Sequence, residues 1–146
     1  MRRSEALAPL SRDHHHALVI ARDLARATPE DAAAVARRFV EFLKRHELAH
    51  FALEESILLP AVGEQEPGPA LAQRVRADHS FLREAMRALA DGDQAPGAER
   101  LHRVGARLRE HVQMEERELF PHLERRLDDP ALEAVGTRLR AGSGEG

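Results

Sequence analysis

The chain has 146 residues and a formal net charge of −3, which suits one ordinary domain with a single core and gives no basic surface for nucleic acid. It contains no cysteine, which excludes disulfides, thiolate metal sites and thiol redox chemistry. No segment is apolar enough to span a membrane, and the N-terminus does not read as a signal peptide. We therefore expect a cytoplasmic protein with neither a nucleic-acid nor a membrane partner.

The composition predicts an all-α fold. Alanine, leucine, arginine and glutamate dominate, all of them strong helix formers, and β-branched residues never alternate over a strand length. Residues 1–10 are expected to be an N-terminal extension. Ser11 suits the N-cap of a first helix that runs to about Ala27. The segment Thr28-Pro29-Glu30-Asp31 predicts a second helix start, with threonine as the cap and proline in the first helical position.

The remaining elements follow from turn residues and prolines. The second helix should run toward Pro60 and stop before Gly63, and a loop over residues 63–69 follows. A third helix should cover roughly residues 70–90, and a fourth roughly residues 98–127 with a bend near Pro121, after a loop over residues 91–97. Residues 128–146 should form a short fifth helix, ending near Arg140, and a disordered tail. Residues 11–127 are thus predicted to be an antiparallel up-down four-helix bundle.

One pattern, H-x3-E-E-x4-P, occurs twice, starting at His50 and at His111. Residues four apart on a helix project to the same side, so each histidine shares a face with the glutamate that follows it, Glu54 or Glu115. Both pairs fall on the apolar stripe of their helix and are expected to point into the core. Because chance would have to act twice at one register, the repeat favours a metal site over a pair of surface contacts.

A second matched pair lies upstream, where Asp13-His14 and Asp78-His79 repeat one dipeptide. His14 and His79 lie on apolar helix faces, and periodicity favours His14 over its neighbour His15 as the inward residue. Each long helix then sends one imidazole inward. We interpret Asp13 and Asp78 chiefly as acids that favour helix starts, with orientation of a metal ligand as the alternative.

These inward groups carry a chemical requirement. An unpaired carboxylate or imidazole is costly in an apolar core, and two facing carboxylates would force one of them to take up a proton. Two cations remove both problems. Four neutral imidazoles and two carboxylates suit a pair of first-row metals, with iron as the leading candidate and manganese or zinc as alternatives.

From about Ser11 to Leu127 the chain resembles the hemerythrin-like family, the HHE cation-binding domain. The resemblance rests on the two Asp-His dipeptides, the two H-x3-E-E segments and the proline that follows each. It implies a four-helix bundle with a non-haem di-iron centre, oxo- or hydroxo-bridged, that binds small molecules such as O2. It further implies that Glu54 and Glu115 bridge the two irons, whose ligands would be His14, His50, Glu54, His79, His111 and Glu115.

Two features depart from the oxygen-carrying hemerythrins. Those proteins have two histidines four apart on the third helix, whereas Val75 and Arg83 occupy the positions four residues from His79. They also place the last carboxylate five residues after its histidine, where this chain has Glu116 in addition to the four-spaced glutamate. The set here looks more like that of di-iron proteins of iron–sulfur-cluster repair, which usually carry a cysteine-containing N-terminal segment that this chain lacks.

Other polar residues near the repeat receive simpler interpretations. Glu55 and Glu116 are expected to be solvated or to support a ligand, because they point away from their histidine. His46 shares the stripe of His50 and is expected to be a core histidine, with support of a ligand or an access gate as the alternatives. His102 is expected to be solvated, and His122 to lie too far along its helix to join the site.

Two rival metal motifs are weaker. His46-Glu47-Leu48-Ala49-His50 fits the H-E-x-x-H pattern of zinc metalloproteases, but Leu53 and Ser56 stand where the downstream continuation would place a glycine and a third ligand. A ferritin-like site needs two Glu-x-x-His pairs, and the second fails at Leu108, three residues before His111.

The sequence thus predicts a protein that binds O2, NO or peroxide at two irons and serves as a sensor, carrier or reserve. The alternative is a di-iron redox enzyme or an iron donor for iron–sulfur repair, and a zinc protease is a remote alternative. The chain has no tyrosine and no tryptophan, which argues against a radical-relay oxygenase.

Overall fold

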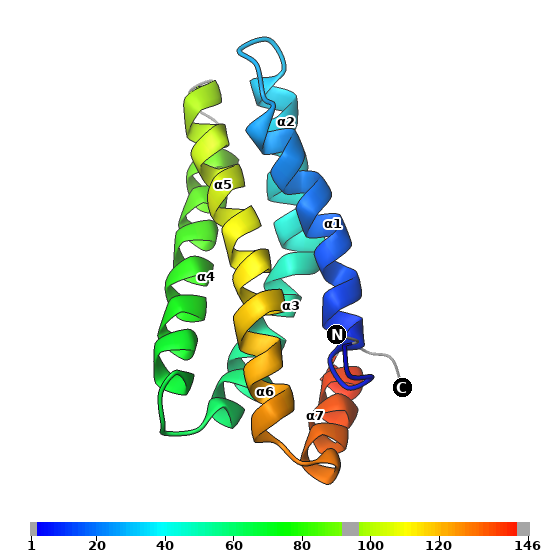
Figure 1. The fold of residues 1–146 in the computed structure, drawn as a ribbon. Coiled ribbons are helices and arrows are strands. Elements are labelled where there is room, and N and C mark those ends of the chain that lie inside the picture. The colour runs from blue at the N-terminus through cyan, green and yellow to red at the C-terminus, as the bar shows by residue number, and fades with distance from the viewer. Residues whose placement is uncertain (1–2, 92–96, 143–146) are drawn as a thin grey trace.

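A computed structural model of the protein describes residues 3–91 and 97–142. Within these ranges the regular structure is helical and no strand occurs, so the all-α prediction is confirmed. The long helices pack side by side (Figure 1). The predicted disordered tail and most of the predicted loop over residues 91–97 lie outside the described residues. The α-helices are α1 (Ala8–Ala25), α2 (Ala32–Phe42), α3 (Leu48–Leu53), α4 (Gly68–Ala90), α5 (Ala98–Met114), α6 (Phe120–Arg126) and α7 (Asp129–Gly142).

Helix α1 begins at Ala8, earlier than the predicted N-cap at Ser11. Leu7 and Leu10 are buried in the core and hold this segment against the bundle, and the proline in the first turn suits that position. The Ser11 hydroxyl instead donates a hydrogen bond to the carboxylate of Glu116, 2.7 Å away. Part of the predicted N-terminal extension therefore packs with the helices.

Helix α2 begins at Ala32, later than predicted, because residues 28–31 form a turn. In this turn the amide of Asp31 donates to Thr28 Oγ1 at 3.3 Å, and the amide of Thr28 donates to Asp31 Oδ1 at 2.7 Å. The two side chains satisfy each other's amides in the manner of a capping box, just ahead of the helix.

Both copies of the repeated motif contain a π turn, η2 (Glu54–Leu58) and η4 (Glu115–Leu119). The amides of Leu59 and Phe120 donate to carbonyl oxygens five residues earlier. The next residue is a proline in both places, and its ring crowds the carbonyl four residues back and offers no amide. The irregularity predicted near Pro121 is thus a π turn, and the motif's proline explains why it recurs.

A further π turn, η1 (Leu43–Glu47), joins α2 to α3. A short 3-10 segment, η3 (Leu59–Val62), ends the helical path before Gly63, as predicted. Residues 104–108, which correspond to η1 in the second copy of the motif, are regular α-helix. The two halves of the repeat therefore differ in the stretch before the histidine.

The buried apolar side chains form two clusters with a polar layer between them. Along α1, Leu10 belongs to one cluster and Ala17 to the other, and His14 lies between them. The same change of cluster occurs on either side of His79 in α4. Leu18, four residues after His14, is 40% exposed, whereas Ala17 is completely buried, so the buried face of α1 turns toward Ala17. No helix in the described ranges is long and apolar enough to cross a membrane.

Helices α1 and α5 approach closely at Gly105, where an added Cβ would lie 2.8 Å from the carbonyl oxygen of Ala21. We expect Gly105→Leu to lower the free energy of unfolding by roughly 1–3 kcal/mol, because the larger side chain has to push the helices apart. Chemical denaturation measures this change. Ala106→Leu, at the exposed neighbouring position, is the control and should change the free energy by no more than about 0.5 kcal/mol. Equal losses in both variants would contradict this close packing.

Candidate metal centre

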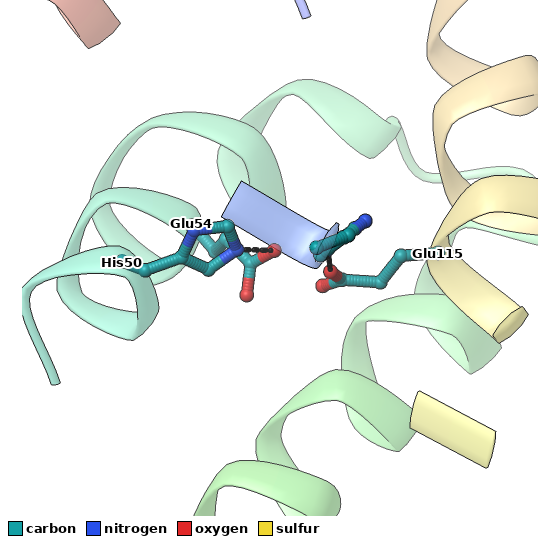
Figure 2. A group of neighbouring side chains, drawn as sticks. His50, Glu54 and Glu115 are labelled. Atoms are coloured by element: carbon teal, nitrogen blue, oxygen red, sulfur yellow. Dashed lines mark hydrogen bonds and ion pairs between the residues drawn. The ribbon is translucent and has the colours of Figure 1, made fainter. Parts of the chain in front are cut away.

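The structure brings all six predicted ligands together in the polar layer, and each is at most 5% exposed. Figure 2 shows His50 and Glu54 on one helical segment and Glu115 on another, with their polar ends directed toward the same space. The ligands form two groups of four residues. Within each group the potential ligand atoms all lie within 4.8 Å of one another. Both groups contain the two glutamates. One is His14, His50, Glu54 and Glu115, and the other is Glu54, His79, His111 and Glu115.

The Nε2 atoms of the four histidines face the two glutamates. Each glutamate lies between the histidine four residues before it and a histidine from another helix. The contacts from Nε2 to a carboxylate oxygen are His50–Glu54 at 3.1 Å, His79–Glu54 at 2.8 Å, His14–Glu115 at 2.8 Å and His111–Glu115 at 3.3 Å.

The second glutamate of each E-E pair binds the opposite nitrogen of a neighbouring imidazole. His79 Nδ1 lies 2.6 Å from Glu55 Oε2, and His14 Nδ1 lies 2.6 Å from Glu116 Oε2. Consecutive residues on a helix point about 100° apart, so an adjacent pair reaches both sides of a ring on the next helix. Of the two roles expected for these glutamates, solvated or supporting a ligand, the structure shows the supporting one.

The interpretation of Asp13 and Asp78 as helix-start acids was wrong. Both lie inside their helices, and their carboxylates contact Nδ1 of the remaining two histidines, Asp13 to His50 at 3.2 Å and Asp78 to His111 at 2.9 Å. All four Nδ1–H groups can therefore donate to carboxylates. This arrangement directs each Nε2 toward the centre in the form that binds a metal. The matched Asp-His dipeptides carried this signal in the sequence.

Two atoms of the centre lack a hydrogen-bond partner among the described residues, His111 Nε2 and Glu115 Oε2. They are 3.3 Å apart but do not have hydrogen-bond geometry. A buried polar group without a partner costs about 1–3 kcal/mol, and a cation in this space would satisfy both atoms. The donor set, imidazole nitrogen and carboxylate oxygen, is one that first-row metal ions accept.

Without metal, attraction between opposite charges outweighs the cost of burial at this centre. Burial lowers the pKa of His14, but hydrogen bonds to the two glutamates of the second motif copy raise it to about 9. Burial likewise opposes the charge on His50 and His111, yet the nearby carboxylates raise the pKa of both well above the usual range. Burial alone would raise the pKa of Glu54, whereas His50 and several hydrogen bonds hold it well below the usual range. Metal ions binding here have to displace protons.

The protease motif is not assembled. His46 belongs to neither group of potential ligands in the described chain. Its side chain is exposed rather than buried as predicted, and its ring lies 5.3 Å from that of His16. Glu47 is buried, and burial raises its pKa to about 7.

Two further histidines bind backbone carbonyl groups away from the centre. His102 is exposed as predicted, and its Nε2–H can donate to the carbonyl oxygen of Ala27 at 2.8 Å. His122 Nε2 lies 2.8 Å from the carbonyl oxygen of Val62, and this histidine belongs to neither group of potential ligands in the described chain.

A comparison with protein families matches residues 6–135 to the hemerythrin HHE cation binding domain. The chain belongs to this family. The match spans both copies of the motif, so the resemblance inferred from the residues is confirmed, and the buried histidine and glutamate cluster fits the metal binding of an HHE domain. Searches of curated proteins and of solved structures gave no significant match.

The metal-free HHE domain should be more stable near pH 6 than near pH 9. The folded pKa of His14 is about 9 against 6.5 unfolded, so its stabilisation is complete below pH 6.5 and is lost as the pH rises through 9. Glu47, with a folded pKa of about 7 against 4.5, acts in the same direction between those values. Thermal unfolding in the presence of a chelator measures this.

Replacing His14 should reduce the pH dependence, because its pKa shift accounts for about 3 kcal/mol at most. His14→Gln should flatten the curve, while His15→Gln, at the exposed neighbouring position, should leave it unchanged. A melting temperature that rises from pH 6 to pH 9 would rule out the ion-paired state of the metal-free centre.

Proposed function

We propose that this chain is a non-haem di-iron protein that binds O2 or a related small molecule such as NO or peroxide. The observation that carries the proposal is the pair of four-residue groups that share two carboxylates. Each group offers two imidazoles and the same two glutamates, which suits two adjacent first-row ions with the glutamates as bridges. The choice of iron over manganese or zinc rests on the family. The proposed ligands are His14, His50, Glu54, His79, His111 and Glu115.

The protein contributes orientation and apolar packing on two sides of the centre. When bound, iron would supply redox chemistry and open positions for a small ligand. Four outer carboxylates accept hydrogen bonds from the Nδ1–H groups and keep each Nε2 turned inward. They belong to Asp13, Glu55, Asp78 and Glu116. The two apolar clusters enclose the polar layer from both sides along the helices, which limits access of water.

Within this proposal we favour a sensor, carrier or reserve of small molecules, and a di-iron redox enzyme or an iron donor is the alternative. The absence of tyrosine and tryptophan leaves no ordinary radical relay beside the centre. Reversible spectral change with O2 would support binding, whereas turnover of peroxide would point to the enzyme. We also infer an antiparallel up-down order of the four long helical stretches, supported by the way the chain in Figure 1 reverses between successive long stretches.

Protein produced in iron-rich medium should contain close to two irons per chain and absorb visible light as a bridged ferric pair. Glu54→Ala and His111→Ala should lose metal, because each removes a donor that nothing else in the layer replaces. His102→Ala, a histidine outside the layer, is the control and should keep both ions. Metal analysis with a visible spectrum gives the answer, and iron retained in both core variants would contradict the ligand set.

The outer carboxylates should tune metal affinity without being ligands. Glu116→Gln and Asp78→Asn should each weaken metal binding by about 10- to 100-fold, since the imidazole they orient loses a charged acceptor. Competition with a chelator measures the affinity. Glu118→Gln removes an exposed glutamate that contacts Arg74 and should have no effect. Full loss of metal in the first two variants would mean that they are ligands themselves.

A further inference from the structure

A cavity of about 260 Å³ lies beside the centre. Its wall includes the proposed ligand His50 and that ligand's hydrogen-bond partner Asp13. His16, His46 and Glu47 also line it. The cavity therefore joins a proposed metal ligand to a set of side chains that bind cations well, none of which is a proposed ligand itself.

Glu47 is the most unusual member of this wall. It is only 4% exposed, and its carboxylate makes no hydrogen bond to any residue that the structure describes. His50 Nδ1 lies 3.8 Å away, which is too long for a hydrogen bond. A buried carboxylate is costly without partners, and this one faces a polar cavity. Its unused lone pairs are available to a cation inside that cavity.

The second copy of the motif has no equivalent carboxylate. Glu47 stands three residues before His50, and the residue three before His111 is Leu108, which is fully buried in the apolar core. The π turn η1 ends at Glu47, whereas the corresponding stretch before His111 is regular helix. π turns often mark functional sites within helices. The departure from symmetry thus lies where the cavity meets the centre.

The second copy of the motif carries a paired arginine at the place that corresponds to the cavity wall. Arg107, which corresponds to His46, donates from Nε to Asp78 at 2.6 Å and lies 4.6 Å from the ring centroid of Phe81. The guanidinium compensates the charge of Asp78, so this pair offers an approaching cation no free carboxylate. Asp13, the counterpart of Asp78, instead lines the cavity. Among the described residues, Asp78 is thus paired with an arginine, whereas its counterpart Asp13 lines the cavity together with Glu47.

We propose that divalent metal cations reach the centre through this cavity, and that Glu47 binds each cation in transit before it passes to His50 and Glu54. This proposal rests on the proposed di-metal function. Four titratable side chains besides His50 line the route, which suits a hydrated cation better than an apolar gas. The described residues at the corresponding places of the second copy, Leu108 and Arg107, offer a cation no carboxylate.

The test is the rate at which the metal-free full-length chain takes up Co²⁺, followed by its visible absorption in a stopped-flow instrument. Glu47→Leu installs the residue that the second copy has at this place. It should slow uptake by about tenfold, the low end of the range over which the charges lining a cleft raise association rates. The final number of bound ions should stay the same as in the unaltered chain, which also shows that the variant folds.

A matched pair of tryptophan variants tests the cavity itself. Ala49 lines the cavity, and Glu110, its counterpart in the second copy, is exposed and does not. Ala49→Trp should slow Co²⁺ uptake and Glu110→Trp should not.

The outcomes distinguish a failure of this route from a failure of the proposed di-metal function on which it rests. If the unaltered chain takes up no Co²⁺ at all, the di-metal function and this route both fail. If it takes up two ions and the Glu47→Leu and Ala49→Trp variants fill at the same rate, the function stands and the route is overturned. Loss of one bound ion in Glu47→Leu would also overturn it, because Glu47 would then be a resident ligand.

Discussion

The structure depends on keeping two charged carboxylates inside an apolar bundle. Glu54 and Glu115 are completely buried, and such charges are tolerated in a protein interior only when they are paired and hydrogen-bonded. The four inward imidazoles provide that pairing from four helical stretches. The buried apolar side chains therefore form two clusters, one on each side of this polar layer. Packing and chemistry in this protein are therefore consequences of one arrangement of charges.

The repeated motif builds this arrangement by joining different helices. Each E-E pair contacts both ring nitrogens of one imidazole from a neighbouring helix. In each Asp-His dipeptide the histidine supplies one inward imidazole, and the aspartate accepts a hydrogen bond from another. Every inward histidine is thus held by at least one residue from another helix. The contacts that orient the centre are the same contacts that hold the helices together across the polar layer. Metal binding and assembly of the bundle must then be coupled thermodynamically.

Helical spacing was enough to find the six inward residues, because direction around a single helix depends only on the position of a residue in that helix. It could not assign Asp13 and Asp78, since their role depends on which side chain of the next helix they meet. It also misplaced His46, which was assigned to the stripe of His50 as if the helix were regular. The π turn between Leu43 and Glu47 breaks that assumption, and nothing in the local sequence marks it as the prolines mark the other two.

The two halves of the centre are alike in their ligands and unlike in their surroundings. On one side Phe51 stacks on His79 with ring centroids 3.9 Å apart and meets His111 edge-on at 6.0 Å. On the other side His50 forms part of a cavity wall. If the proposed function holds, a small molecule or ion would reach the group that contains His50 more directly than the group that Phe51 covers. In the proposed di-metal centre the two positions would therefore be chemically distinct, although the motif that builds them is duplicated.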